Sequence, residues 1–574
     1  MAKQATAKHS QLARSFAQAL ALHRAGRLDE ADRVYGAILA VDPQHCDALH
    51  LSGVLKNQQG QSVEALRLVA AALKAKPGSV DALASYGVVL DALKRHEEAL
   101  ASFDRALAKR AGDAALHYNR GNALKGLGRH ADALASYDRA LALAPDLAVA
   151  HHNRGSTLAE LDRNEEALAS FDRALALTLE RAGIKIEHGI SLAASERSGE
   201  SLEQLDKALA ADPNSADVLN NRGKVLNRLK RYDGAIASFD RSLTLCPDQA
   251  DALSHRGEAL AAVGRFDDAL ADFAQALRLA PDLADAHLKR GNALVAMNRM
   301  DEALRSFAAI LAINPENPDA NFNEALIRLC LGDFCQGWRK YEYRWERKEW
   351  AKDRPTYPRP MWRGEKDLHG KVILLCAEQG LGDAIQFARY APLVAALGAK
   401  VLLGVRPALT ALMATVPGVS QVFGGGETLP HFDLYCPLLS LPLAFATELA
   451  TIPANVPYIR PHEERIAKWR GRLPENGRLR VGICWAGTSG HLNDRNRSIP
   501  LDRFAAMLSV SGLDFVSVQK EVDEAQAALL RDHGVIALGQ EFEDFADTAA
   551  VVAMLDLVIA VDTSVAHLAG AMAK

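Results

Sequence analysis

The sequence lacks several features that would narrow its class at once. No apolar run reaches the ~18 residues of a membrane-spanning helix, and the start, Met1-Ala-Lys-Gln-Ala-Thr-Ala-Lys, has no apolar core of a secretion signal. Its 7 cysteines form neither C-x-x-C pairs nor zinc-type spacings. A net charge of -4, without a lysine or arginine block, excludes the electrostatic footprint of a dedicated nucleic-acid binder. We therefore expect a cytoplasmic protein with no membrane span, no metal site and no nucleic-acid partner.

What the sequence does contain is an internal repeat. The 574 residues are long enough for several domains. Glycine recurs every 34 residues, with Ala325 next in the series, at Gly53, Gly87, Gly121, Gly155, Gly189, Gly223, Gly257 and Gly291. A fixed period of this length is typical of stacked helical hairpins. We expect each glycine to lie where the two helices of a hairpin cross closely.

Two further registers share the period. A small residue stands at Ala31, Ala65, Ala99, Ala133, Ala167, Ser201, Ala235, Ala269 and Ala303. A larger apolar residue follows four positions later, at Tyr35, Val69, Phe103, Tyr137, Phe171, Leu205, Phe239, Phe273 and Phe307. The spacing of four puts both on one helix face. Proline then closes most units, at Pro43, Pro77, Pro145, Pro213, Pro247, Pro281 and Pro315, where it ends one helix and sets the turn.

Together these registers resemble the consensus of tetratricopeptide (TPR) repeats. The resemblance implies an α-solenoid, a TPR superhelix at 12–351, with nine clear units to residue 317 and a divergent unit at 318–351. The fifth unit, 182–215, departs most from the pattern in its first helix. The aromatic and charged stretch Trp338–Trp345 suits a terminal cap with one face toward a following domain.

In a TPR superhelix the first helix of each hairpin lines a groove that binds protein. Asparagine recurs there at Asn119, Asn153, Asn221 and Asn323, and its amide can pair with the backbone of an extended peptide. This partial series resembles that of O-GlcNAc transferases. The alternative, that asparagine is only tolerated on a polar face, has equal weight. The arginines one position later are interpreted as structural partners of aspartates in neighbouring units.

The period changes after Trp350. Prolines at 355, 358 and 360 forbid a continuing helix, so we interpret 352–370 as a linker. Short β-branched runs then alternate with helical stretches, with strands expected at 371–376, 400–405, 479–484, 515–518 and 556–561. The pattern predicts two Rossmann-like α/β lobes, at 371–461 and 462–574. Ligands should bind between them, where strands end and helices begin.

Three strand-end loops carry groups that can bind an anion or move a proton. Gly380 and Gly382 allow backbone to approach a ligand before Asp383. The loop Trp485–Ser498 includes Gly487 and Arg497, and can cradle a diphosphate. The segment Asp562–His567 opens a helix with hydroxyls and N–H groups. Ordinary helix capping by Asp383 or Asp562 is the alternative for each loop alone.

Gly380-Leu-Gly-Asp383 and Asp562-Thr-Ser-Val-Ala-His567 resemble the heptosyltransferase-related family 9 glycosyltransferases, which have the GT-B fold. The resemblance implies that Asp383 is the general base, that Asp562, Thr563, Ser564 and His567 hold the sugar nucleotide, and that no cofactor is needed. Lys520 joins the glycines and Arg497 among the donor-binding candidates. Ser564 departs from the family's usual glycine. GT-B enzymes continue beyond a point equivalent to Lys574, so we expect the second lobe to be incomplete.

The combined pattern predicts a glycosyltransferase that uses a nucleotide-diphosphate sugar, with the solenoid recruiting a protein acceptor. Its architecture resembles that of O-GlcNAc transferases. One alternative is a non-catalytic TPR scaffold with a degenerate transferase domain. Another is a heptosyltransferase-like enzyme that acts on a lipid or polysaccharide.

Overall fold

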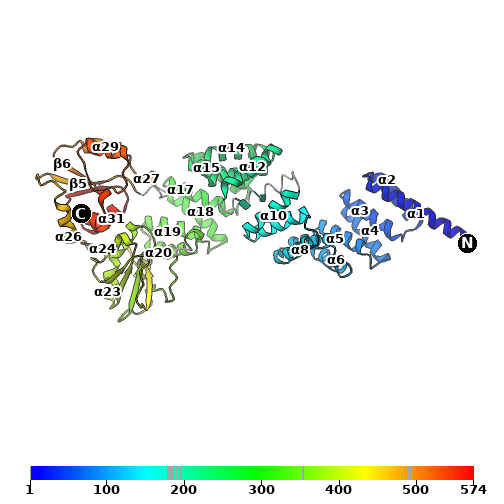
Figure 1. The fold of residues 1–574 in the computed structure, drawn as a ribbon, viewed down its shortest axis with the longest axis horizontal. Helices are drawn as coiled ribbons and strands as arrows, with labels where there is room; N and C mark the ends of the chain where they lie inside the picture. Colours follow the sequence, from blue (N-terminus) through cyan, green and yellow to red (C-terminus); the bar gives the residue numbers. More distant parts are fainter. Residues whose placement is uncertain (1, 178–186, 189–190, 193–196, 352–353, 488–493) are drawn as a thin grey trace. The chain divides into compact units, whose positions relative to one another are not determined.

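The chain forms two compact units, Met1–Lys289 and Arg290–Lys574. The computed structural model describes residues 2–177, 187–188, 191–192, 197–351, 354–487 and 494–574 (Figure 1). Gly189 and most of the first helix expected in the fifth repeat unit lie outside these ranges. Among the described helices, none is long and apolar enough to cross a membrane.

Helical hairpins follow one another as the 34-residue period predicts. They are α1 (Ala2–Arg24) with α2 (Leu28–Val41), α3 (Cys46–Gln58) with α4 (Ser62–Ala75), α5 (Val80–Ala92) with α6 (His96–Leu107), α7 (Ala114–Gly126) with α8 (His130–Leu143), α9 (Ala148–Glu160) with α10 (Asn164–Leu177), α13 (Ala216–Arg228) with α14 (Tyr232–Leu245), α15 (Ala250–Ala262) with α16 (Phe266–Leu279), and α19 (Pro318–Cys330) with α20 (Phe334–Tyr341). Helices α12 (Ser198–Ala211), α17 (Ala284–Ala296) and α18 (Met300–Ile313) belong to the same series.

The glycine register and the aromatic register meet inside six of the described repeats. A Cβ atom added to Gly223 would lie 2.5 Å from Phe239 Cε1, and one added to Gly87 would lie 2.5 Å from Phe103 Cε1. The same overlap recurs at Gly121, Gly155, Gly257 and Gly291. The rings are buried, so they have no free space to enter. Glycine is therefore required because the ring of its own hairpin occupies the position of a side chain.

We expect Gly223→Ala to lower the free energy of unfolding of the first unit by about 1–3 kcal/mol, because the methyl group overpacks against Phe239. Gly36→Ala is the matched control. Gly36 is exposed within α2 and an added Cβ meets nothing within 4 Å, so alanine should stabilise the helix by about 0.5–1 kcal/mol. Thermal unfolding followed by far-UV circular dichroism measures both. Shifts of the same sign in the two variants would contradict this packing.

Arginines link neighbouring repeats in the first unit, which confirms their structural interpretation. Arg120 donates to Asp104 of the preceding repeat at 2.7 Å and to Ser136 of its own repeat at 2.7 Å. Arg154 and Arg222 repeat this arrangement. The arginine side chains are thereby held on the helix surface between repeats.

Two four-stranded parallel sheets follow in the second unit. Strands β1 (Val372–Cys376), β2 (Lys400–Gly404), β3 (Val419–Phe423) and β4 (Leu434–Pro437) have the spatial order β3-β2-β1-β4. Strands β5 (Leu479–Cys484), β6 (Leu513–Ser517), β7 (Ile536–Ala537) and β8 (Leu557–Ala560) have the order β7-β6-β5-β8. All pairings are parallel. The α-solenoid is thus followed by two Rossmann-like α/β sheets, as the sequence predicts.

Short helices connect the strands. Those of the first sheet and the segment before it are η1 (Glu342–Glu346), α21 (Lys348–Ala351), α22 (Leu381–Phe387), η2 (Ala388–Tyr390), α23 (Ala391–Ala396), η3 (Pro407–Leu409), α24 (Thr410–Met413), η4 (Leu438–Ser440), α25 (Leu441–Ala444) and η5 (Leu449–Thr451). Those of the second sheet and the segment before it are α26 (Glu463–Arg470), α27 (Asp494–Arg497), α28 (Leu501–Leu508), α29 (Glu524–Asp532), η6 (Gly539–Glu541), α30 (Phe545–Ala553) and α31 (Ser564–Ala571).

The helical stretch after β1 is broken into two helices. It begins at Leu381, and a 3-10 turn at Ala388–Tyr390 separates α22 from α23. Pro392 lies in the first turn of α23, where it has no N–H to continue the helix from α22. The start at Leu381 places Asp383 inside the first turn of α22.

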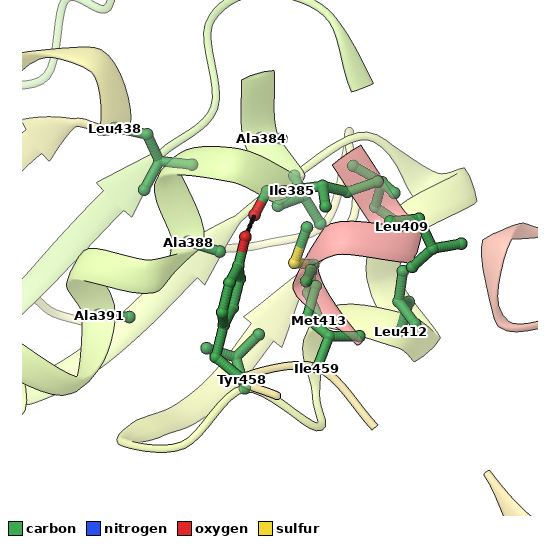
Figure 2. Packing of buried hydrophobic residues seen from close by; sticks show 14 of the residues in the cluster. Ala384, Ile385, Ala388, Ala391, Leu409, Leu412, Met413, Leu438, Tyr458 and Ile459 are labelled. Carbon is green, nitrogen blue, oxygen red and sulfur yellow. Dashed lines mark hydrogen bonds between the residues drawn. The ribbon is translucent and has the colours of Figure 1, made fainter. Parts of the chain in front are cut away.

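One hydrophobic core joins the two sheets. It includes Ile385 and Leu412 beside the first sheet and Leu568 beside the second. Figure 2 shows part of this core, with the Tyr458 hydroxyl donating to the backbone carbonyl of Ile385 at 3.2 Å. The backbone N–H of Tyr458 donates to the carbonyl of Ala571 in α31 at 3.1 Å. Helix α31 therefore packs against both sheets' helices, which fixes the loops that face it.

Candidate functional site

A cavity of about 570 Å³ lies at the carboxyl ends of the strands. In both sheets the first strand in the chain lies between the second and the last, so the connections leave in opposite directions at the β1/β4 and β5/β8 pairs. Ligands of open α/β sheets bind at such topological switch points. The loops after β1, β5 and β8 all contribute to the cavity wall.

All of the predicted catalytic and donor-binding residues line this one cavity. They are Gly380, Gly382, Asp383, Gly487, Arg497, Lys520, Asp562, Thr563, Ser564 and His567. They come from four separate loops of two sheets. The structure thus brings together residues that the sequence separates by up to 187 positions, from Gly380 to His567.

The loop after β1 presents Asp383 in the first turn of α22. The Asp383 carboxylate accepts the backbone N–H of Gly380 at 2.9 Å, which is the acidic half of a capping box. This bond uses one carboxylate oxygen, Oδ2. Asp383 therefore both caps α22 and lines the cavity. Its other carboxylate oxygen can act on a bound hydroxyl.

Gly382 is where the two halves of the cavity touch. A Cβ atom on Gly382 would lie 2.7 Å from His567 Cδ2 and 3.4 Å from Ser564 Cα. Both neighbours belong to the first turns of α31. The absence of a side chain at residue 382 therefore lets the Asp383 helix approach the start of α31.

The loop after β5 is held around Arg497. The Gly487 N–H donates to Ser498 Oγ at 3.0 Å, and Arg497 Nη1 donates to the backbone carbonyl of Asp562 at 3.2 Å. A Cβ on Gly487 would lie 2.2 Å from the Arg497 guanidinium, so glycine leaves room for that group. Residues 488–493 of this predicted loop lie outside the described ranges. The described part places a guanidinium beside the start of α31.

Helix α31 begins without the capping bond that the alternative interpretation requires. Thr563, not Asp562, is its N-cap residue, and the Thr563 side chain makes no capping hydrogen bond. The Asp562 side chain is 80% exposed, with its Oδ1 3.9 Å from His567 Nε2. The N-terminal end of a helix carries partial positive charge and favours an anion. The first residues of α31 line the cavity, so an anion bound there could interact with this partial positive charge.

Several wall residues were not predicted from the sequence. Gln519 is buried and accepts the Ala486 N–H at 3.2 Å and the Cys484 Sγ–H at 3.2 Å, which fixes the start of the β5 loop. Its neighbour Lys520, which is one of the predicted donor-binding residues, donates to the carbonyl of Phe542. Arg406 adds a cation from the loop after β2. Gln519 and Arg406 share a place just after a strand, β6 or β2, so the rule that ligands bind at strand ends is the sequence signal that indicates them.

Acidic residues on the wall are engaged by cations outside it. Glu543 pairs with Lys468 at 2.9 Å, and Asp544 pairs with Arg465 at 3.3 Å. Both cations belong to α26, and both also reach the buried carboxylate of Asp547. The hydrogen bond from Trp469 and the charges of Arg465 and Lys468 overcome the effect of burial and lower the pKa of Asp547. This network ties α26 to α30 and supports the cavity wall.

The four predicted groove asparagines lie on repeat helices and are not among the residues that line the cavity. Asn153 donates to Asn122 at 2.8 Å, and Asn323 donates to Asn292 at 2.9 Å. Asn221 donates to the carbonyl of Asp217, four residues earlier in its helix. Asn119 is half-buried. Three of the amides thus use a donor within the protein, and peptide binding by this set stays a prediction. No group of three or more His, Cys, Asp or Glu in the described ranges could hold a metal ion.

Comparisons with known proteins match the repeat region. Models of the tetratricopeptide repeat match residues 53–114, 186–250, 254–318 and 288–334, and two others match 114–147 and 148–180. Protein FlbA of Caulobacter vibrioides is 28% identical over 275 residues, covering 44% of this chain and 46% of the relative. The match therefore spans less than half of that relative's length.

Solved structures resemble parts of the chain. YrrB, described as a TPR protein with an unusual peptide-binding site, is 26% identical, covers 32% of this chain and 95% of its own, and has a TM-score of 0.28. PilW, described as a type IV pilus biogenesis factor, is 24% identical, covers 36% and 96%, and has a TM-score of 0.34. From the family matches and the hairpin series, the chain is a tetratricopeptide repeat protein between residues 53 and 334, with two parallel α/β sheets after its helical solenoid.

Proposed function

We propose that the chain is a glycosyltransferase that transfers a sugar from a nucleotide-diphosphate sugar to a protein acceptor. The contact of Gly382 with the start of α31 carries this proposal, because it sets a carboxylate beside a place suited to a diphosphate. The two parallel sheets are compatible with the GT-B fold. A cavity of about 570 Å³ is in the range of pockets that bind small molecules.

Each side of the cavity has a role in this reaction. The N–H groups at the start of α31 and the Arg497 guanidinium bind the diphosphate and offset its charge as it leaves. Asp383 takes the proton of the acceptor hydroxyl as the acceptor oxygen attacks the anomeric carbon. The bond between that carbon and the diphosphate oxygen breaks, and the nucleoside diphosphate departs. The repeats supply the protein acceptor through the helices that carry Asn119, Asn153, Asn221 and Asn323.

Binding of nucleotide-diphosphate sugars tests the donor site directly. We expect Arg497→Met to weaken donor binding by about 10-fold or more, since a charge-assisted contact to a diphosphate is worth about 1.5–3 kcal/mol. Isothermal titration calorimetry with a panel of uridine and guanosine diphosphate sugars measures this change.

Arg503→Met is the matched control, because Arg503 is an exposed arginine in the same region and does not line the cavity. Equal donor affinity in Arg497→Met and wild type would show that Arg497 does not bind the donor. Absence of binding by the wild-type chain to every donor would refute the transferase and favour a non-catalytic repeat scaffold.

A further inference from the structure

An arginine with no exposed surface lies between the last repeat helices and the first sheet. Arg344, in η1, is 0% exposed. Its Nη1 atom lies 2.6 Å from Glu342 Oε1, and its Nη2 atom lies 3.1 Å from Glu378 Oε1 and 2.7 Å from Ser440 Oγ. The guanidinium also packs on the rings of Tyr341 and Trp345, with its carbon 4.8 and 4.3 Å from their centroids. We refer to Glu342, Arg344, Glu378 and Ser440 as the buried ionic cluster.

Two consecutive residues of the Asp383 loop are held by this segment. Glu378 bonds to Arg344, and Gln379 Nε2 donates to Tyr341 Oη at 2.9 Å. Gly380 follows at once and Asp383 three residues later. Glu378 Oε1 also accepts the backbone N–H of Leu439, from the turn after β4. The cluster therefore holds the start of the Asp383 loop and joins this loop to the turn after β4, on the other side of the switch point.

A loop with glycines at 380 and 382 needs such support. Glycine gives the backbone wide conformational freedom, which works against a fixed position for a reacting carboxylate. A general base must be held within about 0.5 Å of its productive position. A buried ion pair is a costly way to gain stability, whereas its hydrogen bonds fix direction. Positioning therefore explains the cluster better than stability does.

We propose that α20 and η1 form a positioning element for the candidate active site, in which Arg344 and Tyr341 fix the loop that carries Asp383. The proposal rests on the proposed function, because it assigns the catalytic role to Asp383. Arg344 and Tyr341 are positioning residues, since they act through Glu378 and Gln379. The last helices of the repeat series thereby become part of the catalytic apparatus.

The charges around Glu378 give this arrangement a pH dependence. Burial raises the pKa of Glu378 to about 7, although the Arg344 guanidinium and the Leu439 N–H oppose the shift. The groups that face Glu378 are Arg344 and Glu342 of η1, Tyr341 of α20, Cys376 of β1 and Cys436 of β4. The ionised carboxylate makes the stronger bond to Arg344, so the loop should be held most firmly above this pKa.

Tyr341→Phe tests the positioning element with a change of one atom. Loss of one hydrogen bond should let the backbone amides of 378–383 exchange with deuterium about fivefold faster and lower kcat about fivefold, with the donor KM unchanged. Tyr343→Phe is the control. Tyr343 is in the same segment, but its hydroxyl donates to the exposed Glu316 at 2.7 Å and not to the loop. Full-length protein is used in both measurements.

Glu378→Gln supplies a readout that a purely structural role would not change. It retains the shape of the side chain and removes its titration. The wild-type kcat should rise with pH through a midpoint near the Glu378 pKa of about 7, and this step should be absent from the variant.

Each outcome decides the inference. Amide exchange that is the same in Tyr341→Phe and Tyr343→Phe would overturn it, as would faster exchange with unchanged kcat. A wild-type chain that neither binds nor transfers a sugar would refute the proposed function instead. In that case the exchange data alone would show whether α20 and η1 hold the loop.

Discussion

Asp383→Asn lowers the rate of sugar transfer by about 10²- to 10⁴-fold, which is the contribution that a positioned general base makes. The amide has no basic oxygen to take the proton of the acceptor hydroxyl. Its carbonyl oxygen still accepts the Gly380 N–H that Asp383 accepts at 2.9 Å, so the start of α22 is retained. Donor affinity should therefore stay within about twofold of wild type, because the substitution removes an interaction that is made only in the transition state.

Transfer is measured with a radiolabelled donor at saturating concentration, and donor binding by calorimetry on the same samples. Asp502→Asn is the control, since Asp502 is exposed in α28 and lies outside the cavity lining. Wild-type activity in Asp383→Asn would show that Asp383 is not the general base. Loss of donor binding together with activity would mean that Asp383 holds the donor rather than the acceptor.

The sequence predicts most strands but not all. The expected runs include the cores of β1, β2, β5, β6 and β8, because these strands are apolar over several residues. Strands β3, β4 and β7 were not expected. Residues 420 and 421 in β3 are exposed, as befits an edge strand, while β4 ends at Pro437 and β7 has two residues. Such strands exist through pairing with a neighbour, which local composition does not record.

The site is more predictable than its supports. Residues that follow strands converge because parallel strands end at one edge of a sheet, so strand positions indicate that the predicted site residues lie together. The buried ionic cluster could not. Arg344 lies 34 residues from Glu378 and 96 from Ser440. The stretch around it suggests a cap facing another domain, and Trp338 contacts Phe387 of α22 at 5.8 Å between ring centroids.

Arg344→Met is expected to lower the free energy of unfolding of the second unit by about 3–5 kcal/mol, the usual cost of removing one partner from a buried ion pair. Glu378 and Glu342 would keep their burial and lose their cation. All 6 tryptophans lie between residues 338 and 485, within the second unit, so tryptophan fluorescence during urea unfolding reports that unit alone. Arg339→Met is the control, because Arg339 is exposed on the neighbouring turn of α20.

The loss should depend on pH with a definite sign. The raised pKa of Glu378 means that the folded protein keeps a proton that the unfolded chain releases from about 4.5 upward, so stability falls as pH rises between 4.5 and about 7. Without Arg344 the ionised Glu378 carboxylate is buried without its cation. Arg344→Met should therefore lower the free energy of unfolding more at pH 8 than at pH 5. Adding Glu378→Gln to the variant should recover part of the loss at pH 8. A pH-independent loss, unchanged in the double variant, would place the cost in packing against Tyr341 and Trp345 and not in the uncompensated charge.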